Sequence, residues 1–292
     1  MAKANIKKST NSAYADAWRR LKKNKVAMVS MAVIILLILM AVFADVIVSY
    51  DAAITQSGAL QLAKPSAEHW FGCDHMGRDL FARVIHGSRI SLLLGFLTTL
   101  LTTIVALALG TTAAYLGGKF DNLLMRAFDI LISIPSVLLA LAISAAFGNG
   151  TVQLICAISI GQLASFTRVI RSAVLNLVDQ EYIEAERALG LNHMRIIMTH
   201  IIPNAMGTIL VQFTMQVARN ILMGALLSFL GLGAPIPIPE WGQIASDGVN
   251  YLRYTAHVVI PPTIFITITA LAINLFGDGL RDALDPRLKG KA

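Results

Sequence analysis

The sequence predicts an all-α membrane protein with six transmembrane helices and with both termini on the cytoplasmic side. Of its 292 residues, 56% are hydrophobic and only 14% are charged, whereas about a quarter of the residues in a soluble domain are charged. Long apolar runs recur along the chain, and about 20 residues of helix cross a hydrocarbon core of about 30 Å. Lysine and arginine gather before the first run and after the last, which is typical of cytoplasmic ends.

Residues 1–25 form a basic segment ahead of the first apolar run. Its only acid is Asp16, and its cations are Lys3, Lys7, Lys8, Arg19, Arg20, Lys22, Lys23 and Lys25. The net charge of +7 could indicate nucleic-acid binding, but cations beside a membrane span indicate orientation in the bilayer instead. We therefore exclude nucleic acid as a partner and expect a short amphipathic helix through Tyr14, Trp18 and Leu21.

The first transmembrane helix is predicted at residues 26–50. This apolar run is long enough to cross the membrane and has no small-residue cleavage site, so it is a retained span rather than a signal peptide. Residues 51–88 follow as an external segment in which acids and bases nearly balance.

Residues 89–282 are predicted to form a domain of five further helices, followed by a cytoplasmic tail at 283–292. The second span covers residues 90–118, which carry no charge until the loop that follows. Small residues recur at every fourth position within it, which either admits a neighbouring helix closely or is ordinary helix composition. They are Ala106, Gly110 and Ala114.

The third and fourth spans are predicted on either side of a tight outer turn. A short inner loop leads to the third span, residues 130–147, in which Pro135 is expected to cause a kink. The fourth span covers residues 151–167, with Arg168 and Arg171 at its inner end.

The fifth span is predicted to begin near Pro203. Residues 201–239 carry a single charge but are too long for one straight crossing, so we expect a break at residues 231–233. Residues 234–257 are then external, and the sixth span covers residues 258–276.

Residues 181–203 are the most charged interior part of the chain. Their charged or titratable side chains are Glu181, Glu184, Glu186, Arg187, His193, Arg195 and His200. Each charge would cost several kcal/mol in hydrocarbon, so this segment must lie outside the membrane. Helical spacing of its apolar residues, with Gly190 and Pro203, predicts two short helices joined by an elbow. Such a protrusion suits binding by another protein, and a plain interfacial helix is the alternative.

The chain lacks the common catalytic motifs. It has no P-loop, no HExxH and no GxSxG, so we expect a non-catalytic protein that holds no cofactor and does not itself bind ATP. One cluster, His69, Cys73, Asp74 and His75, contains residue types that bind transition metals, although its spacing matches no standard site. The metal hypothesis therefore stays open.

Several segments resemble one known family. Residues 184–190 together with 202–203 resemble the EAA loop of importer-type ABC transporter permeases. Residues 65–92, PSAEHWFGCDHMGRDLFARVIHGSRISL, are similar to a segment of the dipeptide, oligopeptide and nickel branch of that family. Further segments echo the same branch in the same order: 126–135, 227–235, Trp241-Gly242 and 275–288. The chain has Cys73, Ala82 and Glu186 where the family usually has Thr, Ser and Ala.

The resemblance implies the transmembrane fold of a type I ABC importer, and this chain is most similar to the second of its two permease subunits. It implies these partners: a second homologous permease, two ATPase subunits that bind ATP and Mg²⁺, an external substrate-binding protein, and the lipids of a bacterial or archaeal plasma membrane. The implied cargo is a di- or oligopeptide. Nickel, a nickel chelate and glutathione-like peptides are alternatives, and a stand-alone secondary transporter or channel is the competing class.

The resemblance also implies which residues contact the ATPase subunit, because in this family the EAA loop docks into a groove on that subunit. The docking residues are Glu184, Ala185, Arg187, Leu189, Gly190 and Arg195.

Three polar residues inside the fifth and sixth apolar runs are predicted to face the translocation path: Arg219, Asn220 and Asn274. Arg219 could meet a peptide carboxylate there. The alternatives for Arg219 are pairing with the second permease or extension to the membrane surface, and for Asn274 the alternative is packing against a neighbouring helix.

Overall fold

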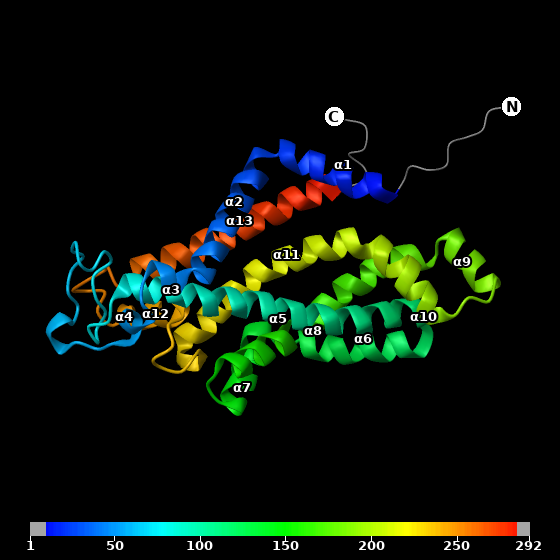
Figure 1. Cartoon of the computed structure of the whole chain (residues 1–292). Coiled ribbons are helices and arrows are strands. Elements are labelled where there is room, and N and C mark those ends of the chain that lie inside the picture. Colours follow the sequence, from blue (N-terminus) through cyan, green and yellow to red (C-terminus); the bar gives the residue numbers. More distant parts are fainter. Residues whose placement is uncertain (1–9, 285–292) are drawn as a thin grey trace.

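The computed structural model describes residues 10–284, which form a long bundle of helices with α4 and α12 at one end and α9 and α10 at the other (Figure 1). The helices are α1 Thr10–Lys23, α2 Lys25–Val42, α3 Ala44–Ile47, α4 Tyr50–Ile54, α5 Leu80–Leu116, α6 Gly118–Ile132, α7 Ser136–Phe147, α8 Thr151–Val178, α9 Glu181–Ala188, α10 His193–Ile196, α11 Ile202–Leu227, α12 Trp241–Val249 and α13 Ile260–Leu284. Two π-helical turns, Ile197–Ile201 and Ser228–Leu232, flank α11, and a 3₁₀ turn covers Gly58–Leu60. Parts of the basic N-terminal segment and of the tail, 1–9 and 285–292, and the Tyr14 side chain lie outside the described residues.

Within the described part of the chain, five helical segments are long and apolar enough to cross a membrane. They are α2, α5, α8, the continuous helix His193–Leu232, and α13. The pair α6 and α7 passes the same test together but is bent by 84°. Counting that pair as one span gives six, so the predicted all-α class with six transmembrane helices is confirmed.

The predicted first span, 26–50, is interrupted, because α2 ends at Val42. Arg89 on α5 donates a hydrogen bond from Nε to the carbonyl of Ala41 at 2.6 Å and another from Nη2 to that of Val42 at 3.1 Å. The guanidinium thus satisfies carbonyls that the end of a helix leaves unpaired. The short helices α3 and α4 then lead into the external segment.

The second span begins earlier than predicted, at Leu80 rather than at residue 90. The carboxylate of Asp79 accepts a hydrogen bond from the backbone N–H of Ala82 at 2.7 Å and so caps α5. Residues 80–88, which were predicted to be part of the external segment, are therefore the first turns of a 37-residue helix.

The third and fourth spans also differ from the prediction. The predicted inner loop is the helix α6, and Pro135 lies at a sharp break between α6 and α7 rather than at a mild kink. α8 continues to Val178, so Arg168 and Arg171 lie within it. Both arginines attach α8 to α6 through the ion pairs Arg168–Asp129 and Arg171–Asp121.

The fifth span is continuous with the short helix before it, so Pro203 lies within a longer helix rather than at its start. Helical geometry ends at Gly231, whose φ of +85° is left-handed. The predicted break in this region is confirmed.

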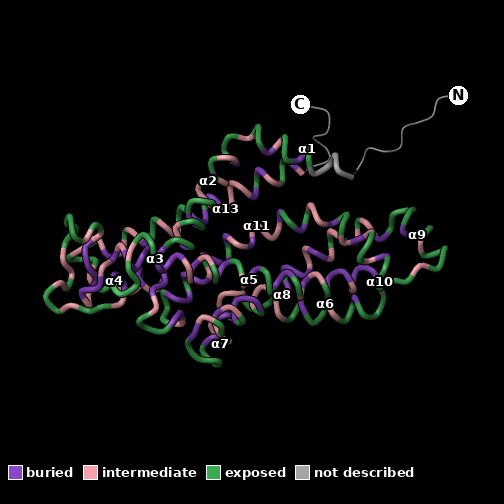
Figure 2. The backbone as a smooth tube through the Cα atoms, viewed as in Figure 1, coloured by how far each residue is buried: buried purple, intermediate pink, exposed green. Residues whose placement is uncertain are grey.

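The core of the bundle lies between α5 and α8. Ala106, Gly110 and Ala114 are all buried, and a Cβ on Gly110 would lie 2.9 Å from the carbonyl oxygen of Thr167 on α8. The small residues therefore do admit a close neighbour. Figure 2 shows buried residues along α5 and α8, whereas much of α2 is exposed.

Candidate functional site

Residues 181–203, which we call the elbow segment, project from one end of the bundle (Figure 1). α9 ends before Gly190, whose φ of +76° lets the chain reverse into α10. Ile183, Ile196 and Ile201 are fully buried in a cluster that includes Val178 of α8. The predicted pair of helices is therefore present, and one of its faces is fixed to the bundle.

The opposite face of the elbow segment is exposed. Leu189 at its tip is 78% exposed. The other predicted docking residues are also exposed: Glu184, Ala185, Arg187, Gly190 and Arg195. Two further exposed apolar residues, Met194 and Met198, extend this face.

Arg187 differs from the rest of the docking set because its guanidinium lies over the ring of Tyr115 on α5, 4.6 Å from the ring centre. The hydroxyl of Tyr115 is 2.9 Å from Nδ1 of His193 on α10. Neither contact was predicted, and nothing in the sequence links Tyr115 to residues more than 70 positions away. The structure thus assigns Arg187 a contact within the chain.

Glu186 stands where the resembled family usually has alanine, and its environment explains how a charge is accepted there. Its Oε1 is 3.0 Å from Nδ1 of His200, which lies in the π-helical turn Ile197–Ile201. The substitution therefore replaces a small packed side chain by a contact that joins α9 to the base of the fifth span.

A polar groove runs along the half of the bundle nearest the elbow segment. Two adjoining hollows of about 530 and 380 Å³ share Asn204 and Thr208 of α11. Their polar lining comes from three helices: Arg168, Ser172 and Asn176 of α8, Asn204, Thr208 and Gln212 of α11, and Arg281 of α13. The four-residue spacing of Asn204, Thr208 and Gln212 places them on one face of α11, a spacing that is visible in the sequence, although these three were not among the predicted path residues.

The predicted path residues separate into two groups. Arg219 is exposed and follows Gln212 by two helical turns, so it continues the same face of α11. Asn274 is half-buried and precedes Arg281 by two turns on α13. Asn220 instead points into the bundle, fully buried, with its side-chain nitrogen 2.9 Å from Oγ1 of Thr99 and its oxygen accepting from Gln162 and Gln216.

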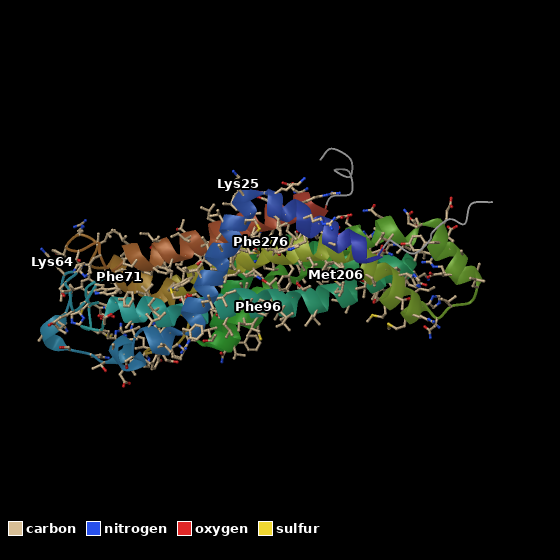
Figure 3. The ribbon with its side chains drawn as sticks, turned by 45° about the horizontal axis from the view of Figure 1, so that its top comes forward. Lys25, Lys64, Phe71, Phe96, Met206 and Phe276 are labelled. Atoms are coloured by element: carbon tan, nitrogen blue, oxygen red, sulfur yellow. The ribbon has the colours of Figure 1, made fainter. Side chains whose placement is uncertain are left out.

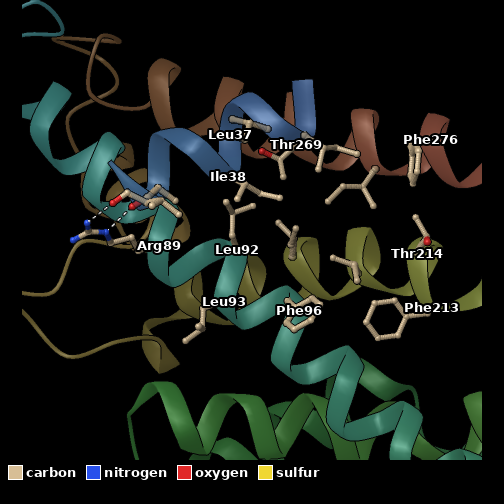
Figure 4. Close-up of a pocket in the computed structure, with 16 residues that line it drawn as sticks. Leu37, Ile38, Arg89, Leu92, Leu93, Phe96, Phe213, Thr214, Thr269 and Phe276 are labelled. Atoms are coloured by element: carbon tan, nitrogen blue, oxygen red, sulfur yellow. Dashed lines mark hydrogen bonds between the residues drawn. The ribbon is translucent and has the colours of Figure 1, made fainter. Parts of the chain in front are cut away.

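Another large hollow is apolar. It has a volume of about 560 Å³ and lies between α2, α5, α11 and α13 (Figure 4). Leu92, Phe96, Phe213 and Phe276 line it, and its one charged lining residue, Arg89, binds the end of α2. Hydrocarbon walls offer a polar cargo few hydrogen bonds, so this hollow is not a candidate path.

The end opposite the elbow segment carries a buried ionic network. Polar atoms gather toward the two ends of the bundle, and carbon dominates around Phe96 and Phe276 (Figure 3). Asp74 accepts from Nε of Arg78 at 2.6 Å and lies 3.4 Å from Nε of Arg83. Asp247 of α12 lies 3.5 and 3.7 Å from the same two arginines. Burial raises the pKa of Asp247.

The metal hypothesis is not supported. His69 binds Asp79 at 2.7 Å, and the His75 ring stacks on Tyr251. Cys73 is fully buried, and burial raises the pKa of its thiol to about 11, which makes it unreactive at neutral pH. No group of three or more His, Cys, Asp or Glu residues within 10–284 is arranged to hold a metal ion.

Comparison with known proteins finds relatives that are all named as transport system permeases and that align with nearly the whole chain. Over 95% of this chain and 91% of the relative, it is 42% identical to a dipeptide transport system permease protein of Alkalihalophilus pseudofirmus. It is 41% identical to an oligopeptide transport system permease protein of Bacillus subtilis, over 97% of this chain and 93% of that protein. A glutathione transport system permease protein of Pectobacterium atrosepticum is 39% identical, over 97% and 94% of the two chains.

The fold has a solved counterpart. A chain of the MetNI methionine ABC transporter in an inward-facing conformation superimposes with a TM-score of 0.59 and 21% identity, covering 70% of this chain and 98% of that one.

Residues 12–65 match the N-terminal transmembrane domain of oligopeptide transport permease C. Residues 106–290 match the family of binding-protein-dependent transport system inner membrane components. This chain therefore belongs to the binding-protein-dependent transport system inner membrane component family.

Proposed function

We propose that this chain is one permease subunit of an ATP-driven importer of di- or oligopeptides in a bacterial plasma membrane. Two relatives that are 41–42% identical over nearly the full length are named as dipeptide and oligopeptide permeases, which supports this cargo. The glutathione permease relative supports small peptides in general, with glutathione as the second candidate. Nickel has no support beyond the sequence resemblance.

The observation that carries the proposal is the exposed, rigid elbow segment on a chain that has no nucleotide motif of its own. Its free face would dock on an ATPase subunit that binds ATP and Mg²⁺, on the cytoplasmic side together with both termini. Closure of two such ATPases would move the elbow segments of this chain and of a second permease, and the spans would pivot as rigid bodies. The free energy comes from ATP, and this chain transmits the movement.

The polar groove is this chain's half of the translocation path in our proposal. Polar stripes on three membrane helices would be costly against lipid, and only part of this lining is paired with other described elements: Arg168 with Asp129 of α6, and Asn204 with Tyr182 of α9. A second permease facing this groove would enclose it. Arg219 and Asn274 belong to this path, whereas Asn220, because it is buried and hydrogen-bonded to three side chains, serves packing between α5, α8 and α11.

Reconstitution tests the proposed function. The chain should transport peptide into proteoliposomes only when its cognate ATPase subunits, second permease and binding protein are all present with ATP. The control omits one component at a time. Uphill uptake by this chain alone would contradict the proposal and favour a secondary transporter.

Replacing Arg219 with alanine is expected to slow uptake of peptides that have a free carboxylate by roughly tenfold or more. A hydrogen bond to a charged group contributes about 1.5–3 kcal/mol, and the variant removes it from the path. The measurement compares variant with wild type for a free peptide and for its C-terminal amide, so that the selectivity of the binding protein cancels. Arg253→Ala, at an exposed external arginine, is the control. Equal slowing of both peptides would rule out carboxylate recognition by Arg219.

A further inference from the structure

Helix α5 connects the two functional ends of the molecule without interruption. It has 37 residues, which at about 1.5 Å per residue gives a rod of about 55 Å. Its outer end is fixed to α12, because the Trp241 indole N–H donates to the carbonyl of Val84 at 2.8 Å and the Ser91 hydroxyl donates to Glu240 at 3.0 Å. Glu240 is itself buried and caps α12, so this attachment is rigid.

The inner end of α5 meets the elbow segment through Tyr115, which is only 6% exposed. This side chain contacts both arms of the elbow. The Arg187 guanidinium of α9 lies over its ring, and its hydroxyl lies 2.9 Å from Nδ1 of His193 in α10. Gly190, where the chain reverses, lies between those two residues.

The elbow segment also contacts the bundle core through an apolar cluster, and its Tyr182 hydroxyl accepts a hydrogen bond from Nδ2 of Asn204 at 3.4 Å, which joins it to α11 rather than to α5. Ile183, Ile196 and Ile201 pack into a cluster with residues of α5 and α8. The hydrophobic effect that drives this packing is non-directional. A hydrogen bond and a cation over a ring, in contrast, fix the distance and orientation of each arm relative to α5.

We propose that Tyr115 is the positioning residue that couples the elbow segment to α5, so that movement of the elbow segment is transmitted along α5 to residues 50–79 and α12, which we call the external cap. Tyr115 holds the two arms at a fixed angle around Gly190 and does not itself contact the ATPase subunit, because it is buried beneath Arg187. This inference rests on the proposed function and adds to it the residue that transmits the movement of the elbow segment to α5.

The test uses Tyr115→Phe in the complete transporter, since this variant keeps the ring and the Arg187 contact but removes the bond to His193. The ATPase subunits are expected to co-purify as with wild type, because the exposed docking face is unchanged. Basal ATP hydrolysis, the KM for ATP and the thermal midpoint should also be unchanged. The increase in kcat caused by cargo-loaded binding protein should fall by about 2- to 10-fold, the range for loss of one neutral hydrogen bond.

Two comparisons make the test specific. His193→Ala should cause a similar loss, and the double variant should be no worse than either single one, because both remove the same bond. Tyr254→Phe applies the same change to a tyrosine that is 85% exposed on the external side, and it should have no effect.

A normal cargo response in Tyr115→Phe would overturn this inference alone, as would loss of the ATPase subunits from the complex or a fully additive double variant. A wild-type complex with no cargo-dependent stimulation would overturn the proposed function as well.

Discussion

Replacing Leu189 with aspartate is expected to release the ATPase subunits from the membrane complex. Leu189 is the most exposed large apolar residue of the elbow segment and lies at its tip. If it enters a dry groove on the ATPase subunit, the new carboxylate would be buried without a partner, at a cost of about 3–5 kcal/mol. That corresponds to a weakening of association by about 100-fold or more. Co-purification of the subunits in detergent measures the loss.

The matched control for this change is Leu252→Asp, which introduces the same charge at a leucine that is 50% exposed at the opposite end of the bundle. It should leave ATPase association at the wild-type level. Because Leu189 makes few contacts within the chain, both variants should insert and fold normally. Retention of the ATPase subunits by Leu189→Asp would show that the docking surface lies elsewhere.

Replacing Asp74 with alanine is expected to destabilise the external cap by about 3–5 kcal/mol, because it leaves buried arginines without their counter-charge. Asp74 is 1% exposed, and Arg78 and Arg83 are equally buried around it. Asp247 remains but is more distant from both guanidinium groups. The thermal midpoint of the purified protein should fall on the order of 10 °C, and amide hydrogen exchange should rise in residues 62–79.

Two further variants separate loss of charge balance from loss of shape in the cap. Asp51→Ala removes an exposed carboxylate near the start of α4 and should change the midpoint little. The double variant Asp74→Leu with Arg78→Met removes one charge of each sign and should recover part of the stability that Asp74→Ala loses. If Asp74→Ala matched the wild type, the network would not be holding the cap together.

The sequence predicted the elements that depend on local composition. Apolar length is enough to identify a span, and the charge density of residues 181–203 predicts that this segment lies outside the membrane. The residues at which helices begin and end were predicted less well, because tertiary contacts decide them. Arg89 ends α2 from a position 47 residues away, and α6 is helical because it packs on α8 through ion pairs rather than running free as a loop.

The direction in which a side chain points was the second feature that the sequence could not predict. Arg219 and Asn220 are neighbours in the sequence and look alike as polar residues in an apolar run, yet one is exposed and the other is fully buried. Adjacent residues on a helix point about 100° apart, so only the packing of α11 against α5 and α8 decides which faces the groove. Tyr115 was missed because its partners are distant in the chain.

The sequence by itself determined that this is a membrane protein and which family the chain resembles, since these follow from composition and from short motifs, and its charge density predicts that residues 181–203 lie outside the bilayer. Only the tertiary structure decided how the elbow segment is attached, which polar residues share one groove, and how the external cap is held. Those features arise from contacts between helices that are far apart in the sequence, and their pairing follows from packing rather than from local pattern.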